Sequence, residues 1–148
     1  YYFVGIIFIF SCQDQKKDKH NVNPDLRDSI LIHLKKFDNN INKEENLNKS
    51  FQFVQRIKND SLQIKYLKTI DYRALNSNSR YYFKINELGR KISRKYTDTI
   101  SLANFYWNLG DSYLNQNKTD SAYYAFNEAQ FLYKQKNELG NYAQMLYN

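Results

Sequence analysis

Residues 103–136 read ANFYWNLGDSYLNQNKTDSAYYAFNEAQFLYKQK, and this stretch gives the clearest indication of the architecture. Apolar and small residues recur in it about one helical turn apart: Tyr106, Leu109, Gly110 and Tyr113, then Ala122, Phe126 and Ala129. Glycine inside a helix costs about 1 kcal/mol relative to alanine, so Gly110 is expected where a second helix approaches the backbone closely. The stretch therefore predicts two helices packed through small residues, with Phe126 filling the space between Ala122 and Ala129.

The same helical period continues on the N-terminal side of this stretch. Four further segments each carry an apolar face: Leu26, Ile30, Leu34 and Phe37; Leu47, Phe51, Val54 and Ile57; Tyr66, Leu67, Ile70 and Ala74; Tyr81, Ile85, Leu88 and Ile92. Short polar runs separate these segments, and Asn59-Asp60-Ser61 and Thr97-Asp98 are expected to cap the helices that follow them. The sequence therefore predicts three helix pairs, at about 25–58, 60–95 and 98–136, and then an unpaired helix at 138–148.

The chain matches itself when it is shifted by about one helix pair. The apolar face of the second segment falls on that of the fourth at an offset of 34, and the fourth falls on residues 122–133 at an offset of 41. These offsets and the residues quoted above resemble the tetratricopeptide repeat (TPR). The resemblance implies an all-α fold, a TPR-like right-handed solenoid of antiparallel helix pairs over residues 25–148.

The resemblance also implies where such a solenoid binds its partner, which would be a protein or a peptide. The exposed face of the first helix in the well-matched pair would form a peptide-binding groove from Asn104, Trp107, Asn108, Asp111, Leu114 and Asn115. Some TPR proteins clamp a peptide carboxylate there with lysine and arginine, and these positions hold no cation. Trp107 has two interpretations, since the only tryptophan is either an exposed anchor for a peptide or a residue packed on the neighbouring helices.

The first twelve residues have a different character from the rest of the chain. Tyr1 to Phe10 is an almost uninterrupted apolar run that is too short to span a bilayer and fits the core of a secretory signal. Ile9-Phe10-Ser11-Cys12 resembles the lipobox of bacterial lipoproteins, which implies lipidation of Cys12 and a polar linker at 13–24. The expected location is the cell envelope, membrane-anchored and extracytoplasmic. If the run were longer, three lysines after it would instead favour a cytoplasmic orientation of that side.

The net charge of +7 is concentrated in the middle of the chain. Residues 59–97 hold nine lysines and arginines against three acids, and six of the cations lie on or next to one predicted helix: Arg80, Lys84, Arg90, Lys91, Arg94 and Lys95. Such a cluster is either the solvated face of a helix or a surface for nucleic acid or anionic lipid. No aromatic residue interleaves with the cations on that face, which disfavours base stacking. We therefore expect a solvated face and regard nucleic acid as an unfavoured partner.

Several classes of chemistry have no support in the residues. Cys12 is the only cysteine, so no internal disulfide forms, and neither it nor His20 or His33 lies at a metal-ligand spacing. No nucleophile, carboxylate pair or phosphate loop accompanies either histidine, so the sequence predicts no enzyme activity and no cofactor. Arrays that look like this often form the sensor region of longer bacterial histidine kinases or transcriptional regulators. The chain is therefore interpreted as a fragment of such a signal-transduction protein, with any output domain after Asn148.

Overall fold

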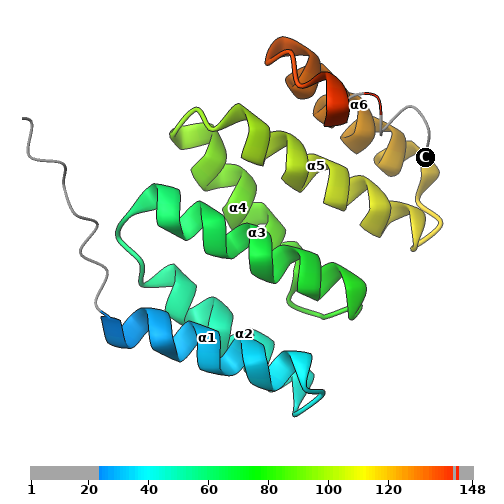
Figure 1. Ribbon diagram of the computed structural model, residues 1–148. Helices are drawn as coiled ribbons and strands as arrows, with labels where there is room; N and C mark the ends of the chain where they lie inside the picture. Colours follow the sequence, from blue (N-terminus) through cyan, green and yellow to red (C-terminus); the bar gives the residue numbers. More distant parts are fainter. Residues whose placement is uncertain (1–23, 142, 144–148) are drawn as a thin grey trace, which may run out of the picture.

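The computed structural model describes residues 24–141 and 143 (Figure 1). It contains six long helices: α1 (Pro24–Asp38), α2 (Lys43–Gln55), α3 (Asp60–Asn76), α4 (Tyr82–Lys95), α5 (Thr99–Leu114) and α6 (Thr119–Gln135). Residues 139–141 and 143 are also helical, and no residue within the described ranges lies in a strand. The predicted all-α class is therefore confirmed.

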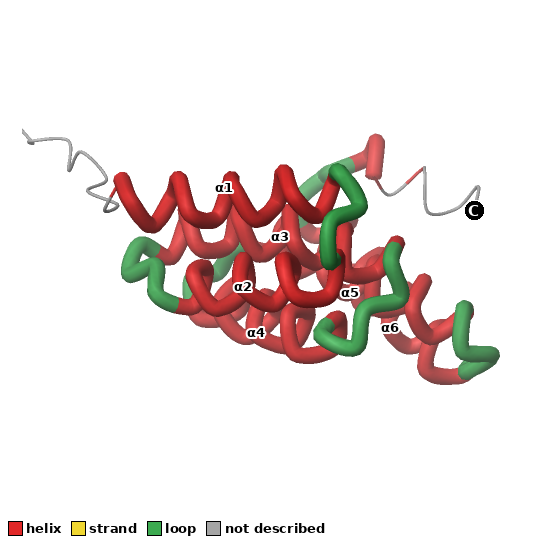
Figure 2. Tube along the Cα trace, turned by 90° about the horizontal axis from the view of Figure 1, so that it is seen from below, coloured by secondary structure: helices red, strands yellow, loops and turns green. Residues whose placement is uncertain are grey.

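Consecutive helices pack as hairpins, and the hairpins stack one on the next. α1 packs on α2, α3 on α4 and α5 on α6, while α2 contacts α3 and α4 contacts α5 at the joints. α3 also contacts α5 directly, although α4 lies between them in the chain. The hairpins follow one another from α1 at the bottom of Figure 1 to α6 at the top, and Figure 2 shows α1 and α3 in one layer with α2 and α4 in another. The α3–α5 contact brings two successive hairpins together on one side of the molecule.

Turns closed by a residue in the left-handed conformation follow five of the six helices. These residues are Asn40, Asn78, Thr97, Asn117 and Asn137, with φ between 50° and 60°. In each turn the next N–H donates to the carbonyl five residues earlier, which satisfies a free carbonyl at the helix end. Asparagine tolerates this conformation better than most residues, and so the scattered asparagines mark where the helices end. The expected caps also form, since the side chains of Asn59 and Asp98 accept from the backbone N–H of Leu62 and Ser101.

The apolar faces predicted from the sequence form the core, except that the buried tyrosine at the start of α4 lies one residue later than predicted. Ile30, Leu47, Leu67 and other predicted residues are buried, and a single cluster extends from α1 to α6. The prediction is wrong at the start of α4, where Tyr82 is buried and Tyr81 only partly so. Ser79 explains the difference, because its hydroxyl accepts from the Tyr81 N–H at 3.1 Å and the helix begins one residue later.

Glycines mark two places where an aromatic ring of the following helix reaches the backbone. A Cβ atom at Gly110 would lie 2.5 Å from Cε1 of Phe126, closer than real contacts allow, so the close approach expected there is confirmed. Gly89 on α4 likewise leaves room for the Phe105 ring of α5, because a Cβ atom at Gly89 would lie 2.3 Å from Cζ of Phe105. The first contact closes the third hairpin, and the second joins it to the hairpin before.

We expect Gly110→Leu to lower the free energy of unfolding by about 1 to 3 kcal/mol, because the new side chain has to displace the Phe126 ring. Urea unfolding followed by circular dichroism measures the change. Gly140→Leu is the matched control, since a Cβ at Gly140 meets nothing within 4 Å. Equal unfolding midpoints for the two variants would contradict this account of the packing.

Candidate functional site

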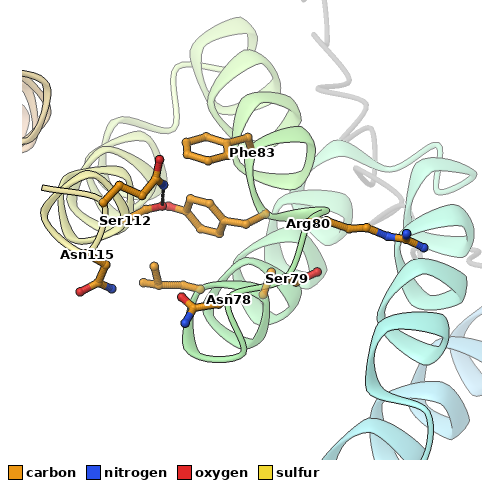
Figure 3. Close-up of a pocket in the computed structure, with 10 residues that line it drawn as sticks. Asn78, Ser79, Arg80, Phe83, Ser112 and Asn115 are labelled. Carbon is orange, nitrogen blue, oxygen red and sulfur yellow. Dashed lines mark hydrogen bonds between the residues drawn. The ribbon is translucent and has the colours of Figure 1, made fainter. Parts of the chain in front are cut away.

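Two adjoining hollows lie where α3 and α5 end side by side, next to the turn that leads into α4, and Figure 3 shows the first of them. The first, here called the apolar hollow, has a volume of about 400 Å³ and is lined by Ala74, Leu75, Asn78, Ser79, Arg80, Tyr82, Phe83, Ser112, Asn115 and Gln116. The second, the acidic hollow, has about 370 Å³ and is lined by Leu75, Asn76, Asn78, Asp111, Leu114 and Asn115. The two share Leu75, Asn78 and Asn115, so one ligand could enter both.

Aromatic rings form part of the wall of the apolar hollow. The Phe83 ring meets that of buried Tyr82 edge-on, with 5.3 Å between centroids, and lies 5.9 Å from that of Tyr113. Phe83 nevertheless remains 42% exposed, so a large part of its ring is open to a ligand. Amide and hydroxyl groups of α5 and of the turn after it add polar character, among them Gln116, whose Nε2 donates to Ser112 Oγ at 3.3 Å (Figure 3). Apolar walls with a few polar groups are typical of sites that bind small molecules or side chains.

Asp111 supplies the only formal charge in the acidic hollow. Its side chain is half-buried, and burial raises the pKa of its carboxyl above the usual value of 3.8. Within the described part of the chain, this carboxyl makes no hydrogen bond or ion pair. Asp111 is therefore a partly desolvated acid that faces a hollow without a counterion.

The six residues of the predicted peptide-binding groove fall into two sets. Asp111, Leu114 and Asn115, near the end of α5, line the hollows. The other three, Asn104, Trp107 and Asn108, contact neighbouring helices of the protein. Tyr133 on α6 donates to Asn104 and meets the Trp107 ring edge-on. Asn108 Nδ2 donates to Asp71 Oδ2 at 2.7 Å. Trp107 is partly buried, so this contact matches the packing interpretation of the tryptophan more closely than the exposed-anchor one.

The contact of Asn108 belongs to a buried polar cluster that joins three helices. Asp71 on α3 is fully buried, and its Oδ1 accepts from Asn86 Nδ2 of α4 at 3.1 Å. Asn86 is also fully buried and donates to the Phe105 carbonyl of α5 at 2.9 Å. Arg90 Nε completes the cluster by donating to Asn86 Oδ1 at 2.9 Å. Since buried polar groups need partners, these bonds fix α3, α4 and α5 relative to one another.

This cluster occupies the place that an apolar contact fills in the next hairpin. The turn residues give the repeat spacing: Asn78 and Asn117 after α3 and α5, Thr97 and Asn137 after α4 and α6. The second interval is 40 positions, one fewer than the offset of 41 expected from the sequence. With these intervals, Asp71 corresponds to Gly110 and Asn86 to Phe126. An acid and an amide thus replace the glycine and ring at the centre of the hairpin.

Sequence reasoning did not single out Asp71, Asn86 or Gly89. One signal was present, because Asp71 directly follows Ile70 and precedes Ala74 on the face predicted to be buried. A carboxyl in such a position needs partners, yet their identity depends on which helices pack together. The partners come from positions 15 and 37 residues away in the chain.

The cations of α4 lie on its outer face. Arg90, Lys91, Arg94 and Lys95 surround a shallow hollow of about 490 Å³ together with Glu87. Two of them are held in place, since Arg90 bonds Asn86 and Arg94 donates to the Tyr106 hydroxyl at 2.8 Å. Lys84 is exposed on the same helix, whereas Arg80 lies 3.9 Å from Glu44 of α2. The four cations Arg90, Lys91, Arg94 and Lys95 therefore form a surface of one helix, and none of them lines the two hollows, whereas Arg80 lines the apolar hollow.

The other residues considered in the sequence analysis either have a structural role or lie outside the described residues. His33 donates a hydrogen bond from Nδ1 to Asn46 Oδ1 at 2.7 Å and stacks on Phe53, so it helps to join α1 and α2. Cys12, His20 and the lipobox-like segment lie outside the described residues. Among residues 24–141 and 143, no group of acids, histidines or cysteines could hold a metal ion. No helix in those ranges has the length and apolar character needed to cross a membrane.

Comparison of the chain with protein-family models, with curated proteins and with solved structures finds no match. The function is therefore inferred from the residues and their arrangement.

Asp71 makes the stability of the fold depend on pH. Burial raises the pKa of its carboxyl to about 7, against the hydrogen bonds from Asn108 and Asn86 and the charge of Arg90, which lower it. Since an unfolded aspartate titrates near pH 3.9, the native state binds the extra proton between about pH 4 and pH 7. Stability from this group is thus present below the unfolded pKa and is lost as the pH rises to about 7.

As the pH rises from about 4 to about 7, we expect the unfolding free energy of the protein to fall relative to that of the Asp71→Asn variant. The expected slope is at most about 1.4 kcal/mol per pH unit. The asparagine imitates the protonated acid if the Asn108 amide turns its oxygen toward it. Urea titrations at several pH values between 4 and 8 measure the difference, and Asp120→Asn, an exposed residue of α6, is the control. Parallel curves for the protein and Asp71→Asn would show that Asp71 titrates normally.

Proposed function

We propose that this chain is a TPR-like scaffold that binds a protein or peptide in the two hollows between α3 and α5. Three features support the solenoid: the hairpins repeat at intervals of about 40 residues, α3 packs on α5, and the third hairpin carries the TPR fingerprint with Gly110 under Phe126. In such arrays, stacked repeats bury one continuous core and leave an extended surface for a partner.

The observation that carries the proposal is that successive hairpins line both hollows together. Leu75 and Asn78 come from the second hairpin, and Asn115 comes from the third. A peptide lying across the joint would place apolar side chains against Phe83 and offer its backbone to the amides of Asn78 and Asn115, which both donate and accept hydrogen bonds. An extended peptide suits this site because it can span both hollows at once.

The location of the protein is part of the same proposal and depends on residues 1–12. We propose that the chain is the extracytoplasmic, lipid-anchored N-terminal part of a longer signalling protein, a histidine kinase or a transcriptional regulator. The supporting feature is the apolar run that ends at Ser11-Cys12 before a polar linker. If Cys12 carries the lipid, the protein will partition into the detergent phase in Triton X-114 extraction and Cys12→Ser will move it to the aqueous phase. Partition of both forms into the same phase would contradict the anchor.

A second candidate function is favoured by the outer face of α4. There Arg90, Lys91, Arg94 and Lys95 lie close together with Glu87 as the only acid of the hollow, which is the charge pattern of a surface for nucleic acid or anionic lipid. This candidate predicts that affinity for DNA or for anionic vesicles falls steeply as salt is added, because binding releases counterions. The peptide proposal predicts a much weaker dependence on salt, because the acidic hollow holds one charged residue, Asp111.

Filling the apolar hollow should weaken peptide binding without unfolding the protein. We expect Asn115→Trp to weaken the binding of peptides selected from a displayed random library by about tenfold or more, because the new ring occupies the space between α3 and α5. Asn127→Trp is the matched control, an exposed asparagine on α6. Fluorescence anisotropy of labelled peptides measures the affinities.

Two results would contradict the peptide proposal. One is a selection that yields no peptide, and the other is equal binding by the Asn115→Trp and Asn127→Trp variants. DNA or vesicle binding that is lost in Lys91→Glu/Lys95→Glu, with no peptide bound, would instead support the second candidate.

A further inference from the structure

The acidic hollow has the composition of a site for a positively charged side chain. Asp111 is its only charged residue, and Asn76, Asn78 and Asn115 contribute three amides around it. Leu75 and Leu114 provide apolar surface in the same hollow. A long cationic side chain needs these two features together, namely apolar surface for its methylene groups and oxygen atoms for its charged end.

The electrostatics of the surrounding helices agree with this composition. Burial raises the pKa of Asp111, and no lysine or arginine lines the acidic hollow. The nearby Arg80 lines only the apolar hollow and lies 3.9 Å from Glu44. The acidic hollow is therefore lined by one acid and no cation, in a chain that is basic as a whole.

We propose that the acidic hollow is a subsite for a lysine or arginine side chain of the bound peptide, and that the apolar hollow takes a neighbouring apolar side chain of the same peptide. This inference rests on the proposed function and names the kind of peptide that the site selects. Asp111 is its specificity-determining residue, because its carboxyl pairs with the ammonium or guanidinium group.

Charge complementarity favours this occupant over the others that the hollow could admit. An acidic side chain would lie against a desolvated carboxylate, which is a repulsive contact. A neutral side chain would leave Asp111 without a partner after the peptide had excluded water from it. A metal ion is a poor candidate, because no group of three acids, histidines or cysteines forms within the described residues.

The test uses three peptide pools that differ at one position. Each is an acetylated random peptide with a fixed leucine followed by lysine, glutamine or glutamate, and each is titrated against the full chain, Asp111→Asn and Asp120→Asn. We expect the lysine pool to bind the full chain about tenfold more tightly than the glutamine pool and the glutamate pool to bind most weakly. In Asp111→Asn the lysine pool should bind no more tightly than the glutamine pool, whereas Asp120→Asn should behave as the full chain does.

The outcomes separate this inference from the function on which it rests. Equal binding of the three pools, or a lysine preference that persists in Asp111→Asn, overturns the cationic subsite and leaves peptide binding intact. If no pool binds, the proposed function fails instead. A direct measurement then decides the subsite: the carboxyl of Asp111 is titrated by NMR with and without acetyl-leucyl-lysine amide. A pKa that falls when this dipeptide is added supports the subsite, and an unchanged pKa overturns it.

Discussion

The arrangement of the second and third hairpins depends on one fully buried carboxyl group. Asp71 accepts hydrogen bonds from Asn86 on α4 and from Asn108 on α5, so a single side chain of α3 is tied to both neighbouring helices. Apolar contacts are tolerant of small sliding movements, whereas these bonds are directional and lose much of their energy when the helices shift. The cluster therefore sets where the ends of α3 and α5 lie, and the two hollows form between those ends.

The same cluster includes one cation of the basic face of α4. Asn86 donates from its amide nitrogen to Asp71 and accepts at its oxygen from Arg90, so it links the buried carboxyl to that face. Arg90, Lys91, Arg94 and Lys95 surround the hollow on α4, whereas Asp111 lines the acidic hollow near the end of α5. A chain with a net charge of +7 can in this way present a local acidic site to a partner.

Much of the fold could be predicted from the sequence, because it depends on residues that are close together in the chain. Helical periodicity identified the buried faces, Asn59 and Asp98 predicted the caps, and Gly110 predicted one of the two close contacts between a glycine and a ring. The candidate site was readable only in part. Asp111, Leu114 and Asn115 line the hollows, in agreement with the exposed face predicted for α5. Asn104 and Asn108 were predicted on the same face, but they form hydrogen bonds with other helices. A helix face predicts exposure in isolation, and a neighbouring hairpin removes part of that face from solvent.

The sequence by itself determined the helical class, the places where the turns fall and the use of glycine in the third hairpin, because each depends on residues within one or two turns of each other. Only the tertiary structure decided that Asp71 and Asn86 take the place of a glycine and a ring, and that hollows open beside Asn78 and Asn115. Those outcomes depend on the register between helices that are distant in the chain. The register results from all the contacts at a joint together, and no short stretch of sequence contains them.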